Sequence, residues 1–187
     1  MTNRQVFSVT LLIVSTLAIL RSMGREWWCS CAGFIPWCWD PWSSHNSQHL
    51  IDYYSFSHVL HGVVFFGVLH VFAADRALTF RFQLAVLLEA GWEILENSSF
   101  VIERYRSVTS ALNYYGDSII NSAGDLGSCA LGFLLASRLP WKVTLLGSLL
   151  IETSMLILIR DNLTLNVLML VWPVESIKSW QLGVPNM

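Results

Sequence analysis

Imidazole and carboxylate side chains recur in this sequence at spacings that could support acid–base chemistry. His58 and His61 are three residues apart, which places both imidazoles on one helical face. Two polar stripes follow at spacings of three or four residues, and their members are Glu89, Glu93 and Glu96, then Asp117, Asn121 and Asp125. Burial raises carboxyl pKa values, so such groups can exchange protons with imidazole near neutral pH. The pattern predicts a site that transfers protons.

Seven of the polar residues are candidates for direct roles in such a site. The candidate catalytic residues are Glu93, Glu96, Asp117, His58 and His61. Either Glu93 or Asp117 is expected to act as the base, with His58 or His61 as its partner. The candidate substrate ligands are Arg160, as a clamp for a phosphate or carboxylate, and Asn121. A purely structural polar network is the alternative interpretation for the whole set.

The composition indicates lipid as the main solvent of the chain. Of its 187 residues, 54% are hydrophobic and only 13% are charged, about half the charged share of a soluble domain. Several of the nine tryptophans lie near the ends of apolar segments, where indole rings anchor a helix at the lipid headgroups. No basic cluster suggests nucleic acid as a partner. The expected partners are the lipid bilayer and a lipid or lipid-linked substrate.

Long apolar runs predict an all-α fold, a polytopic transmembrane bundle of five to six helices. The expected helices are 6–20, 56–74, 84–95, 117–137 and 143–159. Segment 163–172 is too short to cross a bilayer alone, so it is either a broken sixth crossing or an interfacial segment. We expect one membrane domain over 1–187, with a Cys/Trp-rich extramembrane loop at 22–53 and a second connection at 97–115.

Alternation of the crossings brings the candidate residues to one side of the membrane. The second and fourth segments begin, and the third and fifth end, on the side that the Cys/Trp-rich loop faces. We therefore expect the third and fourth segments to be neighbours, with Glu93 or Glu96 in direct or water-bridged reach of Asp117 or Asn121. Glycines of the fourth segment should allow close helix approach: Gly116, Gly124 and Gly127.

The distribution of basic residues favours a cytoplasmic N-terminus. With that orientation, five of the eleven Lys and Arg residues lie on the inner side and five on the outer side, and Lys178 makes a sixth on the inner side if the tail crosses back. Three cysteines in one outer loop also favour an oxidising compartment. The expected location is a bacterial inner membrane, crossed several times, with the polar site at the periplasmic face.

The loop cysteines Cys29, Cys31 and Cys38 have two interpretations. A disulfide between Cys38 and either Cys29 or Cys31 is the favoured one. Cys-x-Cys is a weak zinc pattern to which His45 and His49, four residues apart, could add ligands. No residue is assigned as a metal ligand, and the sequence leaves the cofactor unknown.

Three functional classes fit these features. The first is an enzyme that acts on a lipid or lipid-linked substrate. The second is a non-catalytic membrane assembly factor that docks partners through the Trp-rich loop. The third is a membrane protein that binds zinc or iron through its imidazoles and carboxylates, although no HExxH or ExxH signature is present. A transporter is disfavoured because it needs a polar path to both faces of the membrane, and the cytoplasmic halves of the helices are largely apolar.

Four segments resemble a family of uncharacterised multi-pass bacterial inner-membrane proteins. They are SHVLHG (57–62), WEILENS (92–98), YYGDSIINSAGD (114–125) and RDNLTLN (160–166). The resemblance covers about residues 24 to 180 and implies a multi-pass membrane protein, without an established activity. The stretch Gly116-Asp117-x3-Asn121-x2-Gly124 is also similar to a short motif of VanZ-like membrane proteins.

Overall fold

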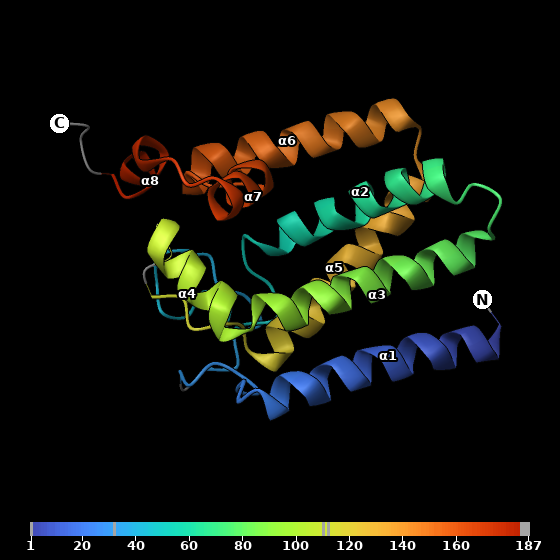
Figure 1. Cartoon of the computed structure of the whole chain (residues 1–187), viewed down its shortest axis with the longest axis horizontal. Coiled ribbons are helices and arrows are strands. Elements are labelled where there is room, and N and C mark those ends of the chain that lie inside the picture. Colours follow the sequence, from blue (N-terminus) through green and yellow to red (C-terminus); the bar gives the residue numbers. More distant parts are fainter. Residues whose placement is uncertain (1, 32, 110, 112, 184–187) are drawn as a thin grey trace.

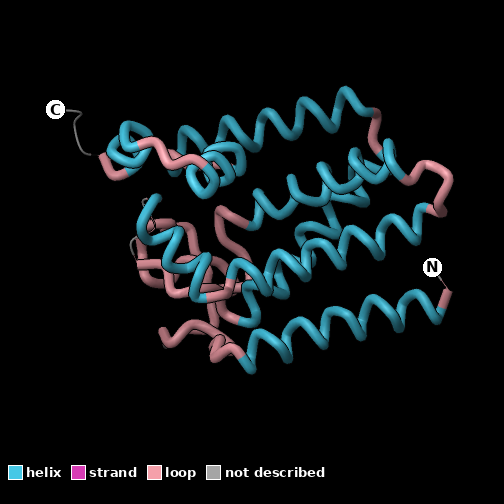
Figure 2. The backbone as a smooth tube through the Cα atoms, in the orientation of Figure 1, coloured by secondary structure: helices cyan, strands magenta, loops and turns pink. Residues whose placement is uncertain are grey.

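Eight helices and a long loop make up the described part of the chain (Figures 1 and 2). The computed structural model describes residues 2–31, 33–109, 111 and 113–183. In chain order the helices are α1 (Asn3–Ser22), α2 (Ser55–Phe72), α3 (Leu78–Glu96), α4 (Ser99–Val108), α5 (Ile119–Arg138), α6 (Trp141–Ile159), α7 (Leu163–Val171) and α8 (Glu175–Gln181). The described ranges contain no strand, which confirms the all-α class.

Four of these helices, α1, α2, α5 and α6, are long and apolar enough to cross a membrane. Their length and composition are those of a membrane protein, and α6 exposes large apolar side chains such as Trp141, Leu149 and Ile157. Helix α3 packs against α1, α2 and α5 (Figure 1). It has 19 residues but carries Arg81 and three glutamates, two of which, Glu89 and Glu93, are buried. Their burial places α3 inside the helical bundle.

Helices α2 and α5 form the closest helix pair. A methyl group added at Gly62 of α2 would overlap the carbonyl oxygen of Cys129, and one at Gly132 of α5 would overlap that of Val59. Each glycine thus lets the backbone of the other helix approach closely. The contact continues into an apolar core in which the rings of Phe66 and Phe133 meet edge to face. Helix α2, which carries both candidate histidines, is fixed by this contact.

The glycines expected to mediate helix contacts have other roles. Gly124 faces the carbonyl of Leu50 in the long loop, and Gly127 has open space around it. Gly116 precedes α5 and has a φ of +92°, a left-handed conformation that favours glycine. The expectation that these three residues bring helices together was therefore wrong, because the α2 face of α5 lies further along the helix, at Gly132.

Helix boundaries differ from expectation, because α3 begins at Leu78, six residues before the expected start, and α4 was not expected. The connection at 97–115 contains α4, which begins where the Ser98 side chain accepts a hydrogen bond from the Val101 amide. Its buried residues, including Val101 and Tyr105, recur at helical spacing although the helix as a whole is polar. Helix α7 has nine residues, about 14 Å of rise, and cannot cross a bilayer alone. Both alternatives, an interfacial segment and a broken crossing that continues to Trp180, stay predictions.

The Cys/Trp-rich loop packs on the start of α5. The Ser118 amide donates to the Ser47 carbonyl oxygen at 2.9 Å, and the Ile119 amide donates to that of Glu26 at 2.8 Å. Cys29 and Cys31 are paired as a disulfide, whereas Cys38 is a free thiol. The expected pairing of Cys38 was wrong because the chain turns sharply between Cys29 and Cys31, whose Cα atoms are 5.2 Å apart.

Candidate functional site

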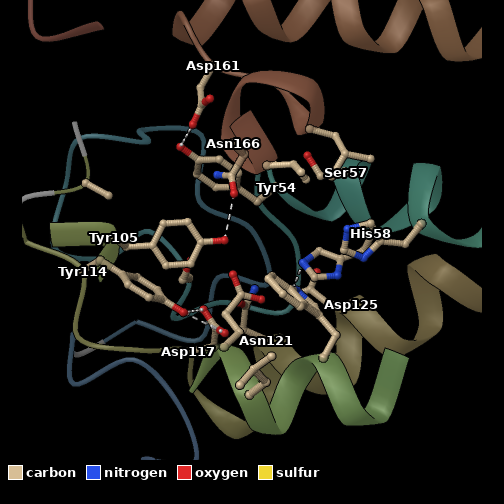
Figure 3. A pocket seen from close by; sticks show the side chains of 18 of the residues that line it. Tyr54, Ser57, His58, Tyr105, Tyr114, Asp117, Asn121, Asp125, Asp161 and Asn166 are labelled. Atoms are coloured by element: carbon tan, nitrogen blue, oxygen red, sulfur yellow. Dashed lines mark hydrogen bonds and ion pairs between the residues drawn. The ribbon is translucent and has the colours of Figure 1, made fainter. Parts of the chain in front are cut away.

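A cavity of about 390 Å³ lies at the end of the bundle that faces the Cys/Trp-rich loop. Helices α2, α3, α4, α5 and α7 all contribute to its wall. Figure 3 shows Tyr105 and Tyr114 on one side of it and His58 and Asp125 on the other. The polar lining comprises Asn46, Ser47, Tyr54, Ser57, His58, His61, Glu96, Tyr105, Thr109, Tyr114, Asp117, Asn121, Asp125, Asp161 and Asn166. Residues from five helices and three connections therefore meet in one space.

The two histidines of α2 share one carboxylate of α3. The Nδ1 atom of His61 lies 3.0 Å from Oε2 of Glu89, and that of His58 lies 2.5 Å from Oε1. Glu89 is fully buried and does not line the cavity, whereas both histidines do. Because Nδ1 of His61 is the ring nitrogen bound to Glu89, its Nε2 is the nitrogen left for another partner. A carboxylate thus orients an imidazole at the cavity wall.

His58 lies among three carboxylates. Besides Glu89, the Oε1 atom of Glu93 is 3.6 Å from its Nδ1, and Oδ2 of Asp125 is 3.8 Å from its Nε2. Glu93 is fully buried, and neither of its carboxylate oxygens has a hydrogen-bond partner in the described part of the chain. One oxygen of Asp125 is likewise buried without a partner there. Buried polar oxygens are normally satisfied, so these atoms are suited to bind a proton or a cation.

Asp117 lies at the cavity wall in a small hydrogen-bonded group. Nδ2 of Asn97 donates to its carboxylate at 2.9 Å, and the Tyr114 hydroxyl donates to it at 3.1 Å. The Asp117 amide donates in turn to Oδ1 of Asn97 at 2.7 Å, which fixes the backbone just before α5. Burial raises the pKa of Asp117 to about 6, even though the hydrogen bonds from Asn97 and Tyr114 favour the charged form. Asp117 can therefore gain and lose a proton near neutral pH.

The opposite wall is built from tyrosines and the connection between α6 and α7. The Tyr105 hydroxyl donates to Oδ1 of Asn166 at 2.8 Å, which joins α4 to α7. The Tyr54 hydroxyl donates to Asp161 at 3.1 Å, and burial raises the pKa of this aspartate to about 6. Burial also raises the pKa values of both tyrosines, so they remain neutral hydrogen-bond donors. This wall offers hydroxyl groups to a bound molecule.

Asn121 has a structural contact as well as a place at the cavity. Its Nδ2 atom donates to the carbonyl oxygen of His49 at 2.7 Å and lies 3.4 Å from Oδ2 of Asp52. Asp52 is fully buried and also accepts the amide of Ser47 at 2.9 Å. Burial raises the pKa of Asp52, against the lowering effect of these backbone amides. Asn121 therefore links the Cys/Trp-rich loop to α5.

The structure brings most of the candidate residues together. His58, His61, Glu96, Asp117 and Asn121 line the cavity. Glu93 lies outside the lining, with its nearest named contact at His58. The hydrogen bond to Asp117 from the end of α3 comes from Asn97. The carboxylate of Glu93 makes no hydrogen bond within the described part of the chain.

Arg160 lies apart from this group. It is exposed, ends α6 in the left-handed conformation and donates to the Trp180 carbonyl oxygen at 3.1 Å. It is absent from the lining of the cavity, so the arrangement gives no support to its role as a substrate clamp. The residue that the candidate set lacked is Glu89, although its i,i+4 spacing to Glu93 was visible in the sequence. The tyrosines carried no comparable signal.

Comparison with known proteins identifies the family of the chain. It is similar to UPF0314 proteins of Rhizobium meliloti (49% identical over 162 residues, 87% of this chain and 82% of the relative) and Sphingopyxis alaskensis (48% over 172 residues, 92% of each). A UPF0314 protein of Paracoccus denitrificans is 45% identical over 171 residues, 91% of this chain and 89% of the relative. No solved structure matches the chain. Because residues 20–183 match the family described as "Protein of unknown function (DUF2585)", the chain belongs to that family.

Proposed function

We propose that this protein is a membrane enzyme that uses acid–base chemistry on a lipid or lipid-linked substrate at the periplasmic face of a bacterial inner membrane. The observation that carries the proposal is the Glu89–His61 pair at the wall of a cavity that is lined by both polar and apolar side chains and has exposed apolar residues at its rim. A carboxylate that holds Nδ1 of a histidine leaves Nε2 free to accept a proton from a substrate.

A second titrating group completes the acid–base pair. Asp117 lines the same cavity, and burial raises its pKa to about 6. A protonated carboxyl at that position can supply a proton to a leaving group while His61 removes one from the nucleophile. The hydroxyl groups of Tyr54 and Tyr105 lie on the facing wall and can accept hydrogen bonds from a substrate, since their own hydrogens are donated to Asp161 and Asn166.

The apolar rim supports a substrate with acyl or prenyl chains. Leu88 and Leu95 of α3 and Val167 of α7 line the cavity, and 45 to 49% of the surface of each is exposed. A water-soluble substrate gains nothing from such a rim, whereas a lipid chain can extend along it into the bilayer. The ring of Trp92 and that of Phe65 continue the apolar lining inwards beside His61.

Two features support a position of the cavity at the level of the lipid headgroups, on the periplasmic face. Four exposed tryptophans lie in the Cys/Trp-rich loop, at the same end of the bundle as the cavity: Trp27, Trp37, Trp39 and Trp42. Exposed indole rings favour the membrane–water interface. Helix α1 begins at the opposite end of the bundle, so a cytoplasmic start of α1 puts the cavity at the periplasmic side.

The test uses two histidines of the same helix. A deletion strain is complemented with the wild-type gene, with His61→Gln or with His70→Gln, and its lipid and lipoprotein profiles are measured. His70 is exposed, contacts Arg81 and lies outside the cavity, so its variant controls for loss of an imidazole on α2. We expect His70→Gln to restore the profile and His61→Gln to fail at normal abundance. An unchanged profile in the deletion strain, or full rescue by His61→Gln, would refute the enzyme and favour the assembly factor.

Metal binding in the cavity wall is a second candidate, favoured by the unpaired oxygens of Glu93. Ligand atoms of His58, Glu93 and Asp125 lie within 4.8 Å of one another, and all three residues are buried. Imidazole with two carboxylates suits zinc or iron. Metal analysis of the purified chain decides this candidate: Glu93→Gln should lower the bound zinc or iron. If the variant retains all of the metal of the wild type, the carboxylates serve proton transfer alone.

A further inference from the structure

A second group of potential ligands lies in the Cys/Trp-rich loop, outside the cavity. The Sγ atoms of Cys29 and Cys31 and one ring nitrogen each of His45 and His49 lie within 4.8 Å of one another. The Sγ atom of Cys29 is 3.1 Å from Nδ1 of His45, and that of Cys31 is 3.6 Å from Nε2 of His49. Two sulfurs and two imidazole nitrogens around one point are the donor set of a tetrahedral zinc site.

We propose that Cys29, Cys31, His45 and His49 bind one zinc ion. The proposal is independent of the function assigned to the cavity. The His-x3-His spacing falls within the usual range for zinc sites, whereas Cys-x-Cys is one residue shorter than the usual Cys pair. The turn between the two cysteines compensates for this, since it brings their Cα atoms to 5.2 Å.

The surroundings orient these ligands as a metal site requires. Nδ1 of His49 lies 2.5 Å from the carbonyl oxygen of Ile35, so this nitrogen carries the proton and Nε2 presents its lone pair to the sulfurs. The Cys31 amide donates to Sγ of Cys29 at 3.2 Å, a contact that stabilises a thiolate. The ring of Trp28 packs edge-on against His49 and limits its rotation.

A simple disulfide does not require the two imidazoles that lie next to the sulfurs of Cys29 and Cys31. Cys29 and Cys31 are paired in the structure, and a disulfide sulfur is a weak acceptor that gains little from two imidazole neighbours. Zinc binding involves the reduced pair, which forms from the disulfide when a two-electron reductant such as an external dithiol supplies two electrons and two protons and is itself oxidised to a disulfide. The two thiols then lose their protons to solvent as two Zn–S and two Zn–N bonds form, with no further electron transfer. The disulfide and the zinc site are mutually exclusive states of the same two sulfurs.

The ligands are anchored to the frame of the cavity. The Cys29 amide donates to the carbonyl oxygen of Gln48 at 3.1 Å, which joins the cysteine segment to the histidine segment. The Ser118 hydroxyl and Nδ2 of the Asn121 side chain, at the start of α5, donate to the carbonyl oxygens of Gln48 and His49. A zinc ion at this point would fix the segment from which Asn46 and Ser47 reach the cavity. Its role is structural, since all four coordination positions are filled by the protein.

The experiment compares three cysteines of one loop in the full chain, purified in detergent under reducing conditions. Zinc content is measured by mass spectrometry, and cobalt is then substituted for zinc to record the absorption that arises only from sulfur–cobalt bonds. We expect about one zinc per chain, its loss in Cys29→Ser and Cys31→Ser, and its retention in Cys38→Ser. The sulfur–cobalt absorption should persist in Glu93→Gln, which separates this site from metal bound in the cavity.

The proposal fails under either of two results. Equal zinc content in the wild type and in Cys29→Ser would show that the sulfurs bind none. The second result comes from alkylating free thiols in intact cells and mapping them by mass spectrometry. If all chains carry the Cys29–Cys31 disulfide and none binds zinc, the oxidised pair is the native state. If the cysteine variants misfold, His45→Ala provides the test instead. It removes an exposed ligand and should weaken zinc binding without unfolding the chain.

Discussion

Replacement of Asp117 by asparagine should stabilise the protein at neutral pH while abolishing its activity. The Asp117 side chain is only 6% exposed, and burial raises its pKa from 3.8 to about 6. Asparagine keeps the shape and can still accept a hydrogen bond from Asn97 or Tyr114, but it is never charged and cannot transfer a proton. The substitution therefore removes the cost of a buried charge together with the chemistry.

The magnitude follows from the pKa difference. Two pKa units correspond to about 3 kcal/mol. Because the folded-state pKa is raised, the contribution of Asp117 to stability is fully present below pH 3.8 and is lost as the pH rises through about 6. Asp117→Asn should thus match the wild type near pH 4 and exceed it by up to about 3 kcal/mol at pH 7.5. For a chain of this size the gain equals roughly 6 to 12 °C in melting temperature.

Thermal unfolding of both proteins in one detergent, at several pH values between 4 and 8, measures this difference. The activity readout is rescue of the deletion strain by the same variant. A lower melting temperature for Asp117→Asn at pH 7.5, or parallel pH profiles for the two proteins, would refute the argument that Asp117 is a destabilised, functional carboxyl. Gain of stability with loss of rescue is the combination expected for a functional residue.

Two further predictions concern the frame of the site, and thermal unfolding and rescue of the deletion strain test both. Gly62→Ala should destabilise the chain by about 1–3 kcal/mol because its methyl group would overlap the carbonyl of Cys129, whereas Gly67→Ala, with open space around it, should be neutral or slightly stabilising. Equal effects at the two glycines would contradict the close α2–α5 contact. Glu89→Gln should cost about 1–3 kcal/mol and also abolish rescue, because His61 loses the carboxylate that orients it. Full rescue by that variant would exclude the histidine as the base.

Much of the architecture could be predicted from apolar runs. The first, second, fourth and fifth segments correspond to α1, α2, α5 and α6, because helices in lipid need long uninterrupted apolar stretches. Alternation of direction was enough to predict that His58, Glu96 and Asp117 meet at one end. Helix α4 escaped prediction because its apolar face is short and its average composition is polar.

The remaining parts of the site depend on packing that periodicity does not encode. Tyr54 and Tyr105 enter the cavity because the connection after α6 and the short helix α7 return to contact them. Arg160 shares a membrane side with the carboxylates, yet its backbone conformation directs it to Trp180. The cysteine pairing likewise depends on a local turn between Cys29 and Cys31, and no spacing rule distinguishes that turn from a longer connection to Cys38.

The reciprocal glycine contacts between α2 and α5 determine which part of the protein can move. Neither helix can slide along the other without driving a side chain into a carbonyl group, so His58 and Asp125 keep a constant separation. Helix α6 contacts this pair only sparsely, and α7 is joined to α4 by two hydrogen bonds, from Tyr105 to Asn166 and from Arg104 to the Leu170 carbonyl. The cavity thus has one wall fixed by close helix contact and one wall, at α7, that is joined to α4 by hydrogen bonds. We expect a lipid substrate too large for the cavity to enter by lateral displacement of α7 in the plane of the bilayer.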